Sequence, residues 1–161
     1  MLSLEPRSLE DICASVEEVG AATGCVDAAG RVGAAMRRQI AAVAGLDAPL
    51  PAPRVACLEW TDPIMVGGHW VPKMVELAGG VDPLGTAGLP GFDLLPCAEN
   101  GRVVAVDGSA FFNRPGPRIT QGMRIIATAV RARSGDAAPE GAAYWNQPAT
   151  SRIALMTPRP L

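Results

Sequence analysis

The sequence predicts an α/β domain: a small Rossmann-like, open and mainly parallel sheet with flanking helices. Two short apolar runs, RVACLEW (54–60) and RVVAVDG (102–108), are rich in β-branched residues and are typical of buried strands. Each run is followed by a turn that contains aromatic residues and then by a helical pattern. Strand, turn and helix in this order form the repeating unit of an α/β sheet.

Two helices are expected before the first strand, within an N-terminal unit that covers residues 1–45. Ser8 is suited to cap the first helix, because Asp11 follows three residues later and can complete a capping box. The second helix is expected over 27–44. Apolar residues at helical spacing support both helices: Leu9, Ile12, Val16, Val19, Val32, Met36, Ile40 and Val43.

Two more helices are expected within the α/β unit, which covers residues 54–132. Pro72 suits the first turn of a helix over 71–78, and the glycine pair that follows would end this helix. A last helix is expected over 117–132. Its apolar stripe consists of Ile119, Met123, Ile126 and Val130.

The remaining segments carry weaker signals. Residues 81–101 are rich in glycine and proline and are expected to form a loop. The tail, 133–161, is expected to be poorly ordered or loosely docked, with a strand possible only at 152–156. Two clear strands are fewer than a stable sheet needs, so part of the expected architecture is missing from the sequence.

Composition narrows the classes of function. The net charge is -2, and the longest basic run is Arg37–Arg38, so nucleic acid and anionic membranes are not expected as partners. The four cysteines are widely spaced and are expected to be free, mostly buried thiols. No secretory signal and no bilayer-spanning stretch is present, which predicts a cytoplasmic location for the chain as written.

Aromatic residues are scarce in this chain, yet they gather in the two turns that follow the expected strands. Ligands of open α/β sheets bind outside the carboxyl ends of the strands. Flat apolar side chains with a few polar groups around them suit a large, flat, partly polar ligand. The candidate binding residues are Trp60, Asp62, His69, Trp70, Phe111, Phe112, Asn113 and Arg114.

Other interpretations of these residues stay open. Trp60 and Trp70 could belong to the core, and one of the adjacent Phe111 and Phe112 is expected to do so, because their side chains point in different directions. His69 suits a helix cap or a hydrogen-bond donor better than a metal ligand or general base. Arg118 is expected to pair with a carboxylate or a loop carbonyl.

Catalysis is not expected. Glu59 and Asp62 could pass for a catalytic carboxylate pair, and together with His69 they leave a metal-dependent enzyme as a minor alternative. However, no nucleophile stands beside a base, no phosphate-binding loop occurs, and no cluster has metal-ligand spacing. The sequence therefore favours a binding protein without catalytic or metal-ligating residues.

Three segments resemble the cobalamin-binding branch of the periplasmic substrate-binding proteins of ABC transporters. These segments are LSLEPRSLEDICASVEEVGAATG, RVACLEWTDPIMVGGHWVPKMVELAGGVD and GRVVAVDGSAFFNRPGPRITQGMRIIATAV. In that family, two α/β lobes are joined by a long helix, and the ligand lies in the cleft between the lobes. The resemblance implies a corrinoid ligand, with haem or an iron siderophore as alternatives on the same fold.

The resemblance also implies site residues and partners. It adds Pro63 to the candidate site and assigns Arg118 to bracing the second turn. Members of the family are typically periplasmic or face the outside of the cell, and they deliver their ligand to an ABC permease.

Two departures from the family pattern bear on function. The family's N-terminal lobe has no counterpart before residue 1, and a helix and strand are lacking around 83–100. The chain therefore resembles a truncated, internally shortened C-terminal lobe. The main alternative to a cobalamin-binding module is a non-binding or partner-dependent fragment, which could form a homodimer through its exposed cleft face.

Overall fold

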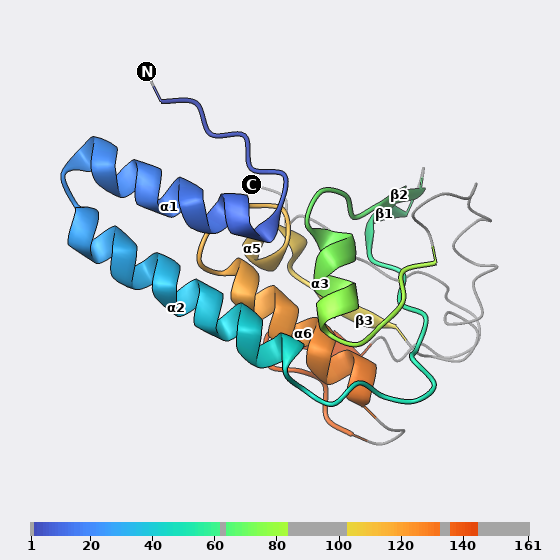
Figure 1. Cartoon of the computed structure of the whole chain (residues 1–161). Helices are drawn as coiled ribbons and strands as arrows, with labels where there is room; N and C mark the ends of the chain where they lie inside the picture. The colour runs from blue at the N-terminus through green and yellow to red at the C-terminus, as the bar shows by residue number, and fades with distance from the viewer. Residues whose placement is uncertain (1, 62–63, 84–102, 133–135, 145–161) are drawn as a thin grey trace.

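The computed structural model describes residues 2–61, 64–83, 103–132 and 136–144, and it combines helices with short strands (Figure 1). The elements are α1 (Leu9–Thr23), α2 (Val26–Ala44), β1 (Leu58–Thr61), β2 (Ile64–Val66), α3 (Val71–Leu77), β3 (Val104–Val106), α5 (Gly108–Phe111), α6 (Ile119–Arg131) and β4 (Ala142–Tyr144). The expectation of a mixed helix-and-sheet fold is therefore confirmed.

Helices α1 and α2 form an antiparallel hairpin that extends to one side of the molecule (Figure 1). The predicted capping box is present: the Asp11 backbone N–H donates to Ser8 Oγ at 3.1 Å, and the Ser8 N–H donates to the Asp11 carboxylate at 3.0 Å. The backbone N–H of Arg7 and these Ser8 contacts hold the pKa of Asp11 below its usual range. Gly24 ends α1 with a left-handed φ of 74°, which a glycine adopts without steric cost.

The core lies where α6 packs against α2, α3 and α5. Its fully buried side chains come from α1, α3 and α6, so the hairpin and the α/β part share one apolar interior. The largest of them are Ile12, Met74, Ile119, Met123, Val75 and Cys13. The α6 stripe predicted from the sequence is thus the face that anchors the aromatic turns.

The strands pair in a way that differs from the expected arrangement. β1 pairs with β2, and β3 pairs with β4, both antiparallel and in separate two-stranded sheets. A parallel contact occurs between Arg54 and Val81, where the Val55 N–H donates to the Val81 carbonyl at 2.8 Å. Within the described residues, therefore, a Rossmann-like parallel sheet is not seen.

Three short elements had no counterpart among the expected ones. β2 and α5 lie inside the two aromatic turns, and β4 lies at 142–144, where no strand was expected. After α6, the chain returns so that β4 pairs with β3. The expected strand at 152–156 lies outside the described residues, as does most of the expected loop at 81–101. None of the described helices is long and apolar enough to cross a membrane.

Candidate ligand-binding turns

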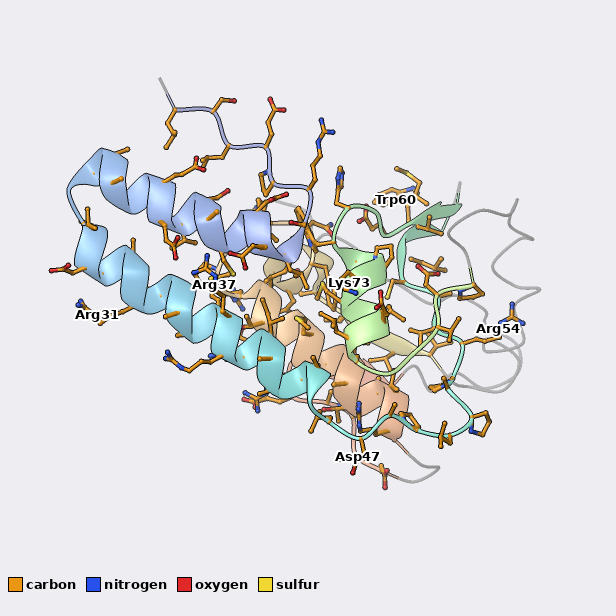
Figure 2. All side chains as sticks on the ribbon, viewed as in Figure 1. Arg31, Arg37, Asp47, Arg54, Trp60 and Lys73 are labelled. Carbon is orange, nitrogen blue, oxygen red and sulfur yellow. The ribbon has the colours of Figure 1, made fainter. Side chains whose placement is uncertain are left out.

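The first aromatic turn, residues 58–70, begins with the hairpin of β1 and β2. Trp60 on β1 pairs with Met65 on β2, so the two side chains share one face of the hairpin. Both are well exposed, at 42% for Trp60 and 54% for Met65. Figure 2 shows Trp60 beside the hairpin. An exposed indole beside an exposed thioether forms an apolar surface that a planar ligand can contact.

The first turn then enters α3 through a tight bend at Gly68 and His69. The Val71 N–H donates to the Gly68 carbonyl at 2.9 Å and closes the bend. His69 has a φ of 52° and is the one non-glycine residue with positive φ in the described part of the chain. Its side chain is exposed, and its ring centroid lies 5.7 Å from that of Trp70, with the planes tilted by 34°.

Trp70 joins the first turn to the second. Its side chain is buried at 7% exposure, and its indole Nε1–H donates to the Phe112 carbonyl at 3.0 Å. Phe112 itself is only 3% exposed and belongs to the core. The two residues are far apart in the sequence, so this buried hydrogen bond fixes the distance between the turns.

The second aromatic turn, residues 107–118, is built around the short helix α5. The Asp107 side chain caps α5 by accepting from the Ala110 N–H at 3.0 Å. The Arg118 guanidinium lies over the ring of Phe111, 4.7 Å from its centroid, which is a cation–π contact. Arg118 thus braces the turn as expected. The contacts identified for it are this ring and, at 3.5 Å, Gln121, in place of the expected carboxylate or carbonyl.

The structure divides the candidate residues into two groups. Trp70 and Phe112 are buried and hold the turns together, whereas Phe111 is partly buried. The prediction that one of the two phenylalanines belongs to the core is confirmed. The candidates whose side chains are exposed are Trp60, His69, Asn113 and Arg114. Asp62 and Pro63 lie outside the described residues.

Met65 is the residue of this surface that sequence analysis missed. It was counted as part of a loop, and the hairpin register is what places it opposite Trp60. The short run Ile64–Val66 was the available signal. However, three residues are too few to distinguish a strand from an extended loop.

The described cysteines differ in their surroundings. Burial, with Asp82 and Glu59 nearby, raises the pKa of Cys57 to about 12, so this thiol is protonated at neutral pH and unreactive. Cys13 is buried and Cys25 is exposed, and these three cysteines are free. In the described part of the chain, no group of three histidine, cysteine or acidic residues could hold a metal ion.

An open cavity of about 640 Å³ lies elsewhere, between α2, α6 and residues 136–137. Its lining includes Val43, Leu46, Arg124 and Arg131, and no residue of either aromatic turn. Arg131 is held there by hydrogen bonds that it donates to the carbonyls of Ala78, Ala127 and Asp47. The cavity is therefore separate from the surface formed by the aromatic turns.

No protein-family model, no curated protein and no solved structure matches this chain.

Proposed function

We propose that this chain is a binding module for a large, flat and partly polar ligand of the corrinoid class. The observation that carries the proposal is the buried hydrogen bond from Trp70 to the Phe112 carbonyl. It links two turns that are distant in the sequence and that carry exposed aromatic and polar side chains. A preorganised surface of this kind binds with less loss of conformational entropy.

The chemistry of the exposed groups supports a planar ligand with a polar periphery. Trp60 and Met65 offer a flat, polarisable, apolar surface to a macrocycle. Asn113 and Arg114 are exposed on the second turn and offer donors to amide or carboxylate groups at its edge. A corrinoid carries amides there, and a haem carries carboxylates, so haem is the alternative within the same proposal.

The proposed module corresponds to one lobe of an ABC transporter substrate-binding protein. The parallel contact between Arg54 and Val81 is consistent with a Rossmann-like βα unit, in which α3 would cross over between parallel strands. A second lobe or a permease would be the natural partner. One lobe buries only part of the ligand, so we expect modest affinity for the chain alone.

The direct test is titration of the purified chain with cyanocobalamin and with haemin, followed by tryptophan fluorescence and by the absorption of the ligand. We expect saturable binding in the micromolar range, about 10⁻⁶–10⁻⁴ M, because a single lobe would bury only part of the ligand. Trp60→Ala should weaken binding by about tenfold, since it removes the exposed indole of the hairpin.

The matched control is Val26→Ala, which truncates another exposed apolar residue at the far end of the α1–α2 hairpin (Figure 1). It should leave binding unchanged. Absence of any change at several hundred micromolar ligand would reject binding by this chain alone. An equal loss in both variants would show that Trp60 has no specific role.

A second candidate function is a partner-dependent module that docks through the same surface. The exposed Trp60–Met65 pair favours it, because large apolar side chains on one face are typical of protein interfaces. We expect the chain to run as a dimer in size-exclusion chromatography with light scattering in this case. A monomer at all concentrations would argue against self-association.

A further inference from the structure

The open cavity between α2 and α6 has no part in the binding function proposed above. The two helices lie side by side (Figure 1), and the cavity follows the second half of each. Its volume of about 640 Å³ is within the range of ligand-binding pockets, roughly 300–1,000 Å³. Its lining contains no residue of either aromatic turn, so a ligand bound here would occupy a separate site.

The described lining of this cavity is mainly aliphatic. Its apolar members are four alanines, Val43 and Leu46, and no aromatic side chain is among the described lining residues. Val43 and Ala127 are buried, whereas Leu46 is 48% exposed and offers apolar surface that the described fold leaves uncovered. Aliphatic walls without a flat ring suit a flexible hydrocarbon chain better than a planar macrocycle.

Two arginines give the same cavity a positive balance of charge. Arg131 is fixed by its hydrogen bonds to carbonyls, so its charge stays in place beside the cavity. Arg124 is exposed, and its guanidinium donates no hydrogen bond within the described residues. Asp136 is the single acidic residue of the described lining. A guanidinium with unused donors beside apolar surface suits a carboxylate, which it can bind through two parallel hydrogen bonds.

We propose that this cavity binds an aliphatic carboxylate of medium chain length. The carboxylate would pair with Arg124, and the hydrocarbon chain would lie along Val43 and Leu46. Arg124 and Arg131 lie about two turns of α6 apart, so a chain of roughly eight carbons matches the cavity length of about 10 Å. The bond from Arg131 to the Asp47 carbonyl places the segment of Leu46 at the far end from Arg124. The chain would thus extend from the free guanidinium toward exposed apolar surface.

The test is titration of the full chain with octanoate, followed by two-dimensional proton–nitrogen NMR. Saturable shifts are expected at residues 39–46 and 124–132, with a dissociation constant of about 10⁻⁴–10⁻³ M, because the cavity is open. Octanol should bind at least about threefold more weakly, and octyltrimethylammonium should not bind, because the first lacks the charge and the second has the opposite sign. Butyrate should bind at least about tenfold more weakly, since it has four fewer methylenes to bury.

Two pairs of variants locate the site. Arg124→Gln should weaken octanoate binding by about three- to tenfold and leave octanol within about twofold, whereas Arg38→Gln, on α2 and outside the described lining, should change neither. Ala42→Phe places a ring in the cavity and should abolish binding of both compounds. Ala41→Phe is its control, because neighbouring helix positions face different directions and Ala41 is exposed outside the lining. Far-UV circular dichroism should be the same for all four variants.

Several results would overturn the proposal. Octanol or octyltrimethylammonium binding as tightly as octanoate would reject recognition of the carboxylate. Binding that persists in Ala42→Phe would place the ligand elsewhere, and absence of shifts at about 10 mM octanoate would reject the site. Shifts of the same residues that grow with protein concentration alone would identify a second copy of the chain as the occupant. Cyanocobalamin binding should be unchanged in Arg124→Gln, so the cavity and the aromatic turns stand or fail separately.

Discussion

The tryptophans of the first turn have opposite environments, although both lie among glycines and prolines in the sequence. Trp70 is buried with its indole N–H donated to a backbone carbonyl, whereas Trp60 is nearly half exposed on a hairpin. Buried tryptophan generally needs a partner for its N–H, and the Phe112 carbonyl meets this need. One tryptophan therefore organises the site, and the other is available to contact a ligand.

Trp70→Phe should destabilise the chain by about 1–3 kcal/mol, because it leaves the Phe112 carbonyl without its buried donor and also removes ring volume. Urea denaturation followed by far-UV circular dichroism measures this change. Trp60→Phe is the control, and it should cost less because Trp60 is 42% exposed whereas Trp70 is buried. Equal losses in the two variants would contradict the structural role given to Trp70.

Gly122 on α6 lies close against the second turn. An added Cβ would lie 2.5 Å from the Phe111 carbonyl oxygen and 3.2 Å from the Phe112 ring, and the nearer of these is backbone. Gly122→Ala should therefore destabilise the chain by about 1–3 kcal/mol. Gly30→Ala on α2 meets no atom within 4 Å and should stabilise by about 0.5–1 kcal/mol. Thermal unfolding of both variants checks the opposite signs.

Among the elements, the helices were predicted well, and the two expected strands overlap β1 and β3, but strands β2 and β4 and the antiparallel pairing were not predicted. The starts of α1 and α3 could be predicted from the sequence, because side chains near a helix start favour that position. The capping box of Ser8 and Asp11 marks the start of α1, and Pro72 marks the start of α3. The described strands have three or four residues, which is too short for an alternating pattern. Their pairing depends on partners elsewhere in the chain, and local sequence does not carry that information.

The α1–α2 hairpin is held at its polar face by Arg37, which binds Glu10 at 2.6 Å and also Glu17. The hydrogen bond from Arg37 holds the pKa of Glu17 below its usual range. The Arg37–Glu17 pair therefore stabilises the folded chain at pH values above the ordinary glutamate pKa of about 4.3. This contribution is lost as the pH falls through the lower pKa that Glu17 has in the folded state. All three side chains are substantially exposed, so the effect should be small and screened by salt.

Arg37→Gln should lower the urea midpoint slightly at pH 7 and low salt, and it should reduce the loss of stability between neutral pH and pH values of about 3. Arg38→Gln is the matched control, because Arg38 is exposed and forms no ion pair in the described chain. The urea midpoints of both variants at the two pH values provide the measurement. An unchanged pH dependence in Arg37→Gln would show that the ion pairs do not couple folding to Glu17.

At the scale of the whole molecule, the sequence predicted which turns would carry the site but not how they meet. The grouping of aromatics after two strand-like runs identified residues 58–70 and 107–118 as candidates. Their contact depends on Trp70 and Phe112, which the sequence placed among the possible ligand contacts and which the fold buries. Periodicity could not separate these roles, because aromatic side chains serve cores and binding surfaces alike.

The ends of three helices meet at Arg131, which connects the hairpin to the α/β part. Its guanidinium donates to Ala78 at the end of α3 at 2.8 Å, to Ala127 within α6 at 2.9 Å, and to Asp47 after α2 at 2.9 Å. A cation at these helix ends also opposes the negative end of each helix dipole. One side chain thus gives a donor to the C-cap carbonyl of α3 and links it to α6 and to the segment after α2.

Arg131→Met keeps much of the aliphatic length and removes all three hydrogen bonds. It should destabilise the chain by about 1–3 kcal/mol, because partly buried carbonyls lose their donor. Arg124→Met on the same helix should change stability by less than about 0.5 kcal/mol, since Arg124 is exposed and its guanidinium donates no hydrogen bond within the described residues. Circular dichroism reports all helices, and fluorescence reports the surroundings of the tryptophans. If Arg131 couples the two parts, the two unfolding curves should coincide in the parent chain and separate in Arg131→Met. Coincident curves in that variant would mean that the shared core alone makes unfolding cooperative.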